Sequence, residues 1–285
     1  MDLGNSHYKL LKKEWGKRHK SIRSKFEEKH REALNKLSAG AASLILLSSS
    51  LNPATALAAA TTQTPPPLIE EKNKVETFLK ELNSIIPQNV RPLNPEEEAT
   101  ISAKLSEFFG MDVMPAINGL RLNRTYGVIG AEQHLIRYPG DNMATHFTSI
   151  INSNLFYSSG MAPGRGAWGY FANSKGELTP ADIEKERWYI AVQTFAALDY
   201  NKRLREYRDF FKYRKMLIVN PLTGQSVVSD IADAGPAVWT GKHLGGSPEV
   251  MHFLGLSEGP RKGAVLYFFI NDPDDKIPLG PINLK

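Results

Sequence analysis

The chain has 285 residues, a formal net charge of +5 and no cysteine, which excludes disulfides, thiol nucleophiles and zinc sites with cysteine ligands. Residues 1–60 hold 11 of the 35 Lys and Arg residues and 5 of the 30 Asp and Glu residues, leaving 24 basic and 25 acidic residues beyond them. Because the basic excess lies at the N-terminus, the charge of the remainder does not indicate nucleic-acid binding.

Residues 1–60 have the pattern of a signal peptide. A basic stretch runs from Lys9 to Lys36, a short apolar core lies within Ser38–Leu51, and Ala54–Ala60 forms a small-residue cleavage region. The core is shorter than the roughly 20 apolar residues of a transmembrane helix. We therefore expect secretion or a cell-envelope location, with membrane contact through this leader only. The alternatives are a basic amphipathic helix before a linker, or an uncleaved N-terminal anchor.

A helical segment is predicted at 70–110, after a Pro/Thr linker at 61–69. Apolar side chains between 70 and 86 fall on one face of a helix. Asn94 has the properties of an N-cap for a second helix, with Pro95 in the first turn, and Gly110 ends that helix. We interpret the pair as a scaffold or spacer that packs on the main domain.

Residues 111–159 are rich in loop-forming residues, with one possible short strand at 126–129. His134, Asp141 and His146 lie in this region, and three such side chains are a conceivable metal-ligand set. Their spacing matches no zinc pattern. We therefore predict neither a metal site nor a cofactor, and we expect these residues to connect the helical segment to a domain at 160–285.

From residue 160 onward the sequence predicts short strands separated by small helices. The predicted strands are 164–171, 188–195, 216–219, 226–231 and 263–270, and the predicted helices begin near Thr179, Asn201 and Ser247. Asn220–Gly224 has the composition of a tight turn that makes a hairpin of the third and fourth strands. Because no βαβ alternation is present, we expect an α+β fold in which a small barrel carries helical insertions.

Six segments follow one another in a distinctive order between residues 160 and 270. They are Gly166–Tyr170, Ile190–Gln193, Ile218–Val228, Asp233–Pro236, Ser247–Leu254 and Ala264–Phe269. This order resembles the RlpA-like double-psi β-barrel proteins of bacterial cell walls, which are related in fold to expansins and to some lytic transglycosylases. The resemblance implies a six-stranded double-psi barrel. The chain departs from the family pattern at Ala234, where a basic residue is usual, and in a long insertion before Lys215.

The resemblance also implies an activity. In catalytic relatives, the aspartate at the position of Asp233 is a general acid and then a base on a glycosidic bond, and the sugar's own 6-hydroxyl replaces water. One carboxylate suffices for this chemistry, whereas hydrolysis usually uses two. The implied function is that of an exported peptidoglycan lytic transglycosylase. The alternative is a non-catalytic barrel that binds peptidoglycan or another cell-wall polysaccharide, or that has a structural role.

Asp233 follows a predicted strand, in a backbone that Gly235 and Pro236 force to bend. As a general acid it would need a raised pKa, for which Val228, Ile231 and Trp239 would supply apolar surroundings. The alternative is an Asx-turn acceptor that holds the loop.

The candidate substrate-binding residues are aromatic or basic side chains near the predicted barrel mouth: Trp168, Tyr170, Trp239, Lys242 and His243. The tryptophans would stack on sugar rings, and the basic residues would meet acidic or acetylated groups. Core packing is the alternative for Trp168, and a solvated loop is the alternative for His243. Glu249 is a possible second carboxylate, although its place at the start of a helix also suits the helix dipole.

Overall fold

The computed structural model describes residues 67–285, which belong to one compact unit. The predicted leader and residues 61–66 of the predicted linker lie outside the described residues. Between residues 67 and 285, no helix combines the length and the apolar character needed to cross a membrane.

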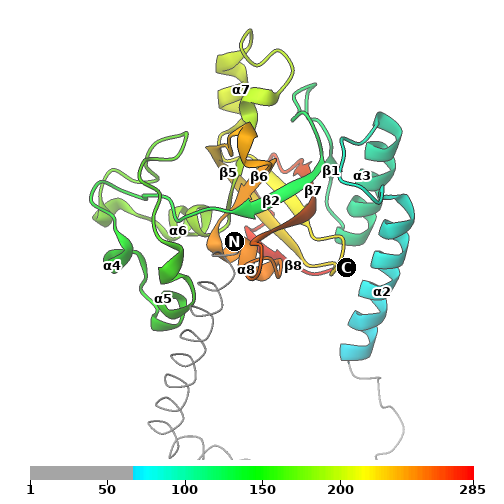
Figure 1. Ribbon diagram of the computed structural model, residues 1–285, viewed down its shortest axis with the longest axis horizontal. Helices are drawn as coiled ribbons and strands as arrows, with labels where there is room; N and C mark the ends of the chain where they lie inside the picture. Colours follow the sequence, from blue (N-terminus) through cyan, green and yellow to red (C-terminus); the bar gives the residue numbers. More distant parts are fainter. Residues whose placement is uncertain (1–66) are drawn as a thin grey trace, which may run out of the picture. The chain divides into compact units, whose positions relative to one another are not determined.

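Six strands of the described chain close into a mixed barrel (Figure 1). They are β2 (Tyr126–Ala131), β3 (Tyr189–Val192), β4 (Lys215–Val219), β5 (Ser226–Ala234), β6 (Leu244–Gly246) and β7 (Lys262–Ile270). Their order around the barrel is β7-β2-β6-β3-β5-β4, and β4 pairs with β7 to close it. The β2–β6 and β3–β5 pairs are parallel, and the other pairs are antiparallel. The predicted α+β barrel with helices is therefore confirmed.

Two short strands extend the sheet beyond the closed barrel. β1 (Val113–Met114) pairs with β7, and β8 (Gly280–Ile282) pairs with β5, both in the antiparallel sense. The hairpin predicted from the turn residues is present, because Val219 at the end of β4 pairs with Ser226 at the start of β5.

Aliphatic side chains point inward from the strands and fill the barrel. Each strand supplies at least one fully buried residue to this core, namely Ile129, Ile190, Ile218, Ile231, Leu244 and Val265. Each side chain of this size contributes about 1.5–3 kcal/mol when it is removed from water. This apolar interior fixes the barrel, and polar chemistry is left to its two ends.

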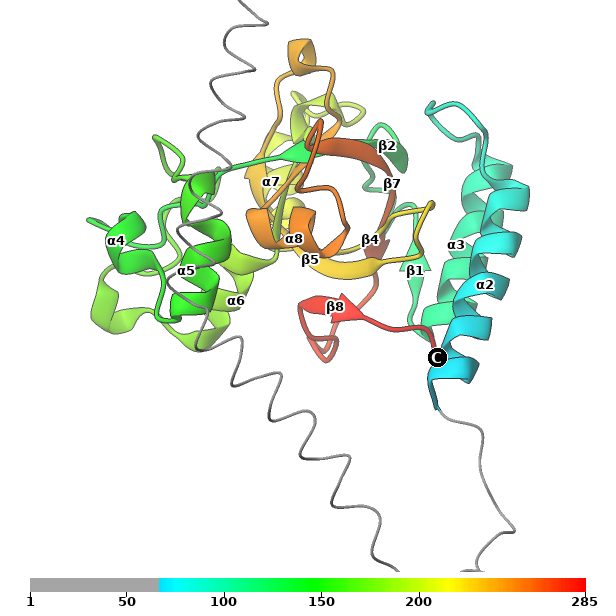
Figure 2. The same cartoon turned by 60° about the horizontal axis from the view of Figure 1, so that its bottom comes forward.

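The helical segment packs on the outside of the barrel through a second apolar cluster. α2 (Pro67–Ile85) and α3 (Pro95–Phe109) lie side by side (Figures 1 and 2). Phe78 and Leu105 from these helices share the cluster with Leu217 and Phe268 from the strands. The predicted cap is confirmed, because the Asn94 side chain accepts a hydrogen bond from the Glu97 N–H and the Glu97 side chain accepts one from the Asn94 N–H.

The insertions between the strands carry the remaining helices. They are α4 (Met143–His146), α5 (Ile150–Phe156), α6 (Pro180–Arg187), α7 (Leu204–Phe211) and α8 (Pro248–Phe253), with 3₁₀ turns at Tyr157–Ser159, Lys175–Glu177, Thr194–Ala196 and Val238–Thr240. In both views, α4, α5 and α6 gather on the side of the barrel away from α2 and α3 (Figures 1 and 2). Thr179 caps α6 as predicted, since its hydroxyl accepts from the Asp182 N–H.

One strand prediction is wrong. Residues 164–171 do not form a strand, because the Gly169 N–H bonds the Gly166 carbonyl at 3.0 Å and closes a tight turn. Gly169 has φ 95°, a conformation open to glycine but strained for other residues. The barrel strand that precedes β3 in sequence is β2, which lies within the range expected to be a loop-rich connection.

Replacement of Phe78 by alanine should lower the free energy of unfolding by about 3–5 kcal/mol, because it empties a site in the cluster between the helices and the barrel. The Phe78 ring is fully buried and lies 5.0 Å from Phe108 and 5.6 Å from Phe109, centroid to centroid. Urea unfolding measures this change. Thr77→Ala, on the exposed face of α2, is the matched control and should change stability by less than about 0.5 kcal/mol. A Phe78→Ala loss as small as that of the control would show that α2 does not stabilise the barrel.

Candidate functional site

The end of β5 places Asp233 at one rim of the barrel. Ile231 pairs with Ile190, but the next pair along the parallel strands is Asp233 with Ala191, so Ala232 is an extra residue that makes a bulge. A bulge changes the direction of the following side chains and is frequent next to active sites. The bulge therefore sets the orientation of the Asp233 carboxyl, and the local sequence gives no sign of it.

The two oxygens of Asp233 have different environments. Oδ1 accepts hydrogen bonds from the backbone N–H groups of Ala167 and Ala234, both at 2.8 Å. No hydrogen bond to Oδ2 occurs among the residues that the structure describes. Burial raises the pKa of Asp233 above its ordinary value, the two backbone N–H groups oppose the rise, and the charge of Glu132 adds to it. One oxygen is thus anchored, and the other is available to carry and transfer a proton.

The turn at Gly166–Gly169 crosses the end of β5 beside this carboxyl. Ala167 bonds Asp233, and the Trp168 indole N–H donates to the Ile231 carbonyl at 2.9 Å. Trp168 packs partly on the barrel core. Its remaining surface lines a cavity of about 360 Å³ with residues that come mostly from α7: Leu204, Arg205, Arg208, Asp209 and Lys212. The lining of this cavity thus combines three cationic side chains, one carboxylate and an indole face.

The other predicted substrate-binding residues lie in different settings. Trp239 is 89% exposed, and Tyr170 is 37% exposed with the Arg165 guanidinium 5.4 Å from its ring centroid. Lys242 is occupied in an ion pair, with its Nζ 2.6 Å from the Glu132 carboxylate. The His243 Nδ1 accepts from the Val128 N–H at 2.9 Å, and burial lowers the pKa of His243.

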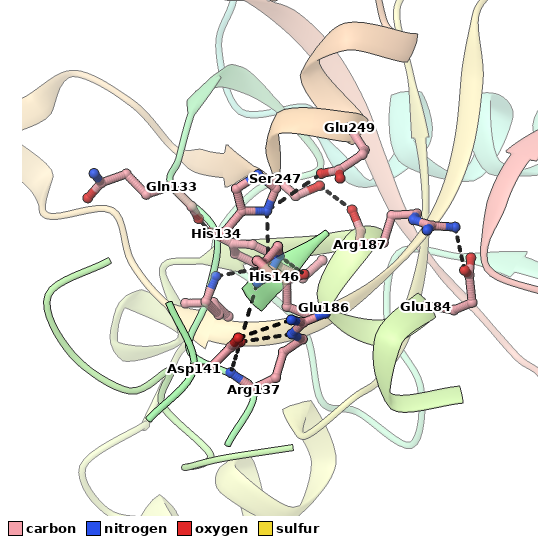
Figure 3. A network of polar contacts seen from close by, with 12 residues as sticks. Gln133, His134, Arg137, Asp141, His146, Glu184, Glu186, Arg187, Ser247 and Glu249 are labelled. Carbon is pink, nitrogen blue, oxygen red and sulfur yellow. Dashed lines mark hydrogen bonds and ion pairs between the residues drawn. The ribbon is translucent and has the colours of Figure 1, made fainter. Parts of the chain in front are cut away.

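A buried polar cluster occupies the rim where β2 and β6 end and β3 begins (Figure 3). Since β2 and β6 are parallel, the residues that follow them meet there, namely His134 after β2 and Glu249 in α8. β3 is antiparallel to β6, so Glu186, which precedes β3, reaches the same place. His146 of α4 completes the cluster, and all four residues are more than 90% buried.

Hydrogen bonds hold this cluster together. The Glu186 carboxylate lies 3.3 Å from the His134 Nδ1 and 3.0 Å from the His146 Nε2, and it accepts from the Leu135 N–H at 2.9 Å. The Ser247 hydroxyl caps α8 and also donates to the Arg187 carbonyl at 2.6 Å, which ties the end of α6 to α8.

Asp141 and Arg137 support the cluster from the side. The Arg137 guanidinium makes two hydrogen bonds to the Asp141 carboxylate, at 2.8 and 3.0 Å, and Asp141 lies 3.3 Å from the His146 Nδ1. The set considered from sequence, His134, Asp141 and His146, is therefore only partly brought together, because Asp141 is occupied by Arg137. Glu186 takes its place beside the two histidines, and only the strand topology shows this.

Burial and pairing decide the charges of the cluster. Burial would lower the pKa of His146, but the carboxylates of Asp141 and Glu186 outweigh it and raise that pKa to about 9. Burial would raise the pKa of Glu186, but the two histidines lower it to about 2. For Glu249 burial prevails and raises the pKa to about 7. The side chains of His134, His146 and Glu186 present ligand atoms that lie within 4.8 Å of one another, so this group has the donors of a metal site.

Asp230, a further buried carboxyl on β5, was not singled out from the sequence. It is 1% exposed, and neither of its oxygens has a hydrogen-bond partner in any other described residue. Burial raises the pKa of Asp230 well above the ordinary value, against the opposing charges of Lys185 and Lys215. It lines a cavity of about 450 Å³ with Lys185, Lys215 and Tyr213. The residue types of this strand do not distinguish Asp230 from a surface acid.

Comparison with models of known protein families finds no match, and comparison with curated proteins finds no relative.

The contribution of Asp230 to the free energy of unfolding should fall as the pH rises above about 4, where the unfolded chain loses the Asp230 proton. The folded protein keeps the Asp230 proton at pH values where the unfolded chain has released it, so the folded state binds more protons and loses stability as the pH increases. Denaturant unfolding of the wild type and of Asp230→Asn between pH 4 and pH 8 measures this effect. The free energy of unfolding of Asp230→Asn, relative to that of the wild type, should increase as the pH rises. A constant difference between the two curves would contradict a raised pKa for Asp230.

Proposed function

We propose that this protein is an exported cell-envelope protein that acts on the glycan strands of peptidoglycan as a lytic transglycosylase, with Asp233 as its acid and base. The observation that carries the proposal is the Asp233 carboxyl, half-buried at the barrel rim, with a raised pKa and one oxygen without a hydrogen bond to a described residue. The order of the segments from Ile190 to Phe269 supports a double-psi arrangement of the barrel. The leader pattern at 1–60 supports export, into the envelope or beyond it.

The proposed reaction needs only this carboxyl. Protonated Asp233 donates its proton from Oδ2 to the glycosidic oxygen while the C1–O bond breaks. The resulting carboxylate then accepts the proton of the sugar's 6-hydroxyl, whose oxygen bonds C1 and closes an anhydro ring. The N–H groups of Ala167 and Ala234 stabilise the negative charge that Asp233 carries between the two steps. No water is consumed, and the carboxyl ends in its starting state.

The surroundings of Asp233 offer contacts for a polysaccharide. The cavity beside Trp168 contains Arg205, Arg208 and Lys212, whose charges suit the peptide carboxylates of peptidoglycan. Exposed Trp239 provides an aromatic face of the kind that stacks on sugar rings. Lys242 pairs with Glu132, and His243 accepts a hydrogen bond from Val128. Both residues therefore hold the barrel rim in position for the polysaccharide.

A second candidate is a barrel that binds the same polysaccharide without cleaving it. The two N–H groups at Oδ1 favour the binding role, because they oppose the rise in the pKa of Asp233 and so act against its protonation. In this case Asp233 holds the turn at Gly166–Gly169 in place, and Trp168, Trp239 and the basic cavity supply the binding surface.

The test is to incubate the full chain with peptidoglycan and to measure anhydro-sugar products by mass spectrometry. Asp233→Asn should reduce product formation by at least about 100-fold, the usual contribution of a general acid or base. Asparagine keeps an oxygen that can accept from Ala167 and Ala234, so the fold should persist. For the wild type, the rate should fall as the pH rises through the raised pKa of Asp233, since the proton to be donated is lost.

Asp274→Asn, which changes an exposed carboxylate in the same way, is the matched control and should leave product formation unchanged. Equal products from the wild type and Asp233→Asn, or no products from either, would exclude the catalytic proposal. Co-sedimentation with insoluble peptidoglycan then decides the second candidate, because a binding barrel sediments with the polymer and a purely structural barrel stays in solution.

A further inference from the structure

Two imidazole nitrogens and a carboxylate converge at the rim where β2 and β6 end. The His134 Nδ1 lies 3.3 Å from one oxygen of Glu186, and the His146 Nε2 lies 3.0 Å from the other. A tetrahedral zinc ion with bonds of about 2.0–2.1 Å keeps its donor atoms about 3.3–3.4 Å apart. The two nitrogen–oxygen distances are close to that spacing, and one ligand atom from each of the three residues lies within 4.8 Å of the other two.

The groups behind these donors are those that orient metal ligands. The His146 Nδ1 faces Asp141 at 3.3 Å, which directs the Nε2 toward Glu186, and Arg137 fixes Asp141 through two hydrogen bonds. Glu186 is itself held by the Leu135 N–H. A carboxylate behind a ligating histidine is the usual outer support of a metal site, and it sets both the tautomer and the direction of the ring.

Hydrogen bonding within the cluster does not account for the burial of Glu249. Its Oε2 is buried without a hydrogen-bond partner in any other described residue, and it lies 3.9 Å from the His134 Nδ1. Figure 3 shows its carboxyl directed at the histidine. A cavity of about 30 Å³ has His146, Glu186 and Glu249 among its lining residues. A buried carboxylate oxygen without a donor is costly unless a cation or a proton meets it.

We propose that His134, His146 and Glu186 bind a zinc ion, with Glu249 as the fourth protein ligand. Nitrogen donors favour zinc over the hard cations Mg²⁺ and Ca²⁺, which take oxygen ligands. The two glutamates neutralise the charge of the ion. The four ligands come from the segment after β2, from α4, from α6 and from α8, so the ion joins the insertion that carries α4 and α6 to the barrel. This site is independent of the proposed reaction at Asp233.

The test is to titrate the chelator-treated full chain with ZnCl₂ by calorimetry and to follow thermal unfolding in parallel. One zinc ion per chain should bind at the cluster with micromolar or tighter affinity and raise the unfolding temperature, whereas MgCl₂ should do neither. His146→Gln removes a nitrogen ligand and should weaken this binding by at least tenfold. Co²⁺ should give the visible absorption of a tetrahedral nitrogen and oxygen site, and the same substitution should abolish it.

Two further variants keep the test decisive. Glu249→Gln preserves shape but removes a ligand charge, so it should weaken zinc binding by at least tenfold even if His146→Gln fails to fold, which circular dichroism detects. His252→Gln changes an exposed histidine on α8 and should bind zinc as the wild type does. The chain has four other histidines, at positions 7, 19, 30 and 243. Zinc binding that is equal in the wild type, His146→Gln and Glu249→Gln would assign the ion elsewhere and overturn the proposal, as would no binding at all.

Discussion

β2 runs parallel to β6 and β3 runs parallel to β5, in a barrel that β4 and β7 close. These directions decide where each polar side chain lies. The ends of β2 and β6 meet the beginning of β3 at one rim, which collects His134, Glu249 and Glu186. The bulged end of β5 brings Asp233 next to the turn at Gly166–Gly169. Without the parallel pairs, these residues would not meet.

The same physical effect, removal of a carboxyl from water, gives opposite results at the two places. Asp233 has backbone N–H groups as partners but no cation among its described contacts, and burial prevails to raise its pKa. Glu186 lies between two histidines, which outweigh burial and hold its pKa at about 2. The first carboxyl is therefore suited to exchange a proton, and the second is suited to remain an anion beside nitrogen donors. The groups that contact each carboxyl, more than its burial alone, therefore decide whether it exchanges a proton or remains ionised.

Local chemistry was enough to predict the caps at Asn94 and Thr179, the hairpin around Asn220–Gly224 and the strand that ends the barrel. Each depends on residues a few positions apart, whose preferences are expressed wherever the segment lies. β2 was only partly predicted because glycines interrupt a short apolar run, and the segment 164–171 was misassigned because aromatic residues between glycines also fit a turn. The cluster around Glu186 could not be predicted, since Glu186 lies 52 residues after His134 in the sequence and only strand pairing brings the two segments together.

The state of the Asp233 carboxyl is the point on which the proposed chemistry depends. A pH titration of its side-chain carbon by ¹³C nuclear magnetic resonance, assigned by comparison with Asp233→Asn, measures its pKa in the folded chain. If Asp233 is the acid of the proposed reaction, the midpoint lies above 3.8, the ordinary value for aspartate. A midpoint at or below 3.8 would show a carboxylate held ionised by Ala167 and Ala234, and it would contradict a role in proton transfer.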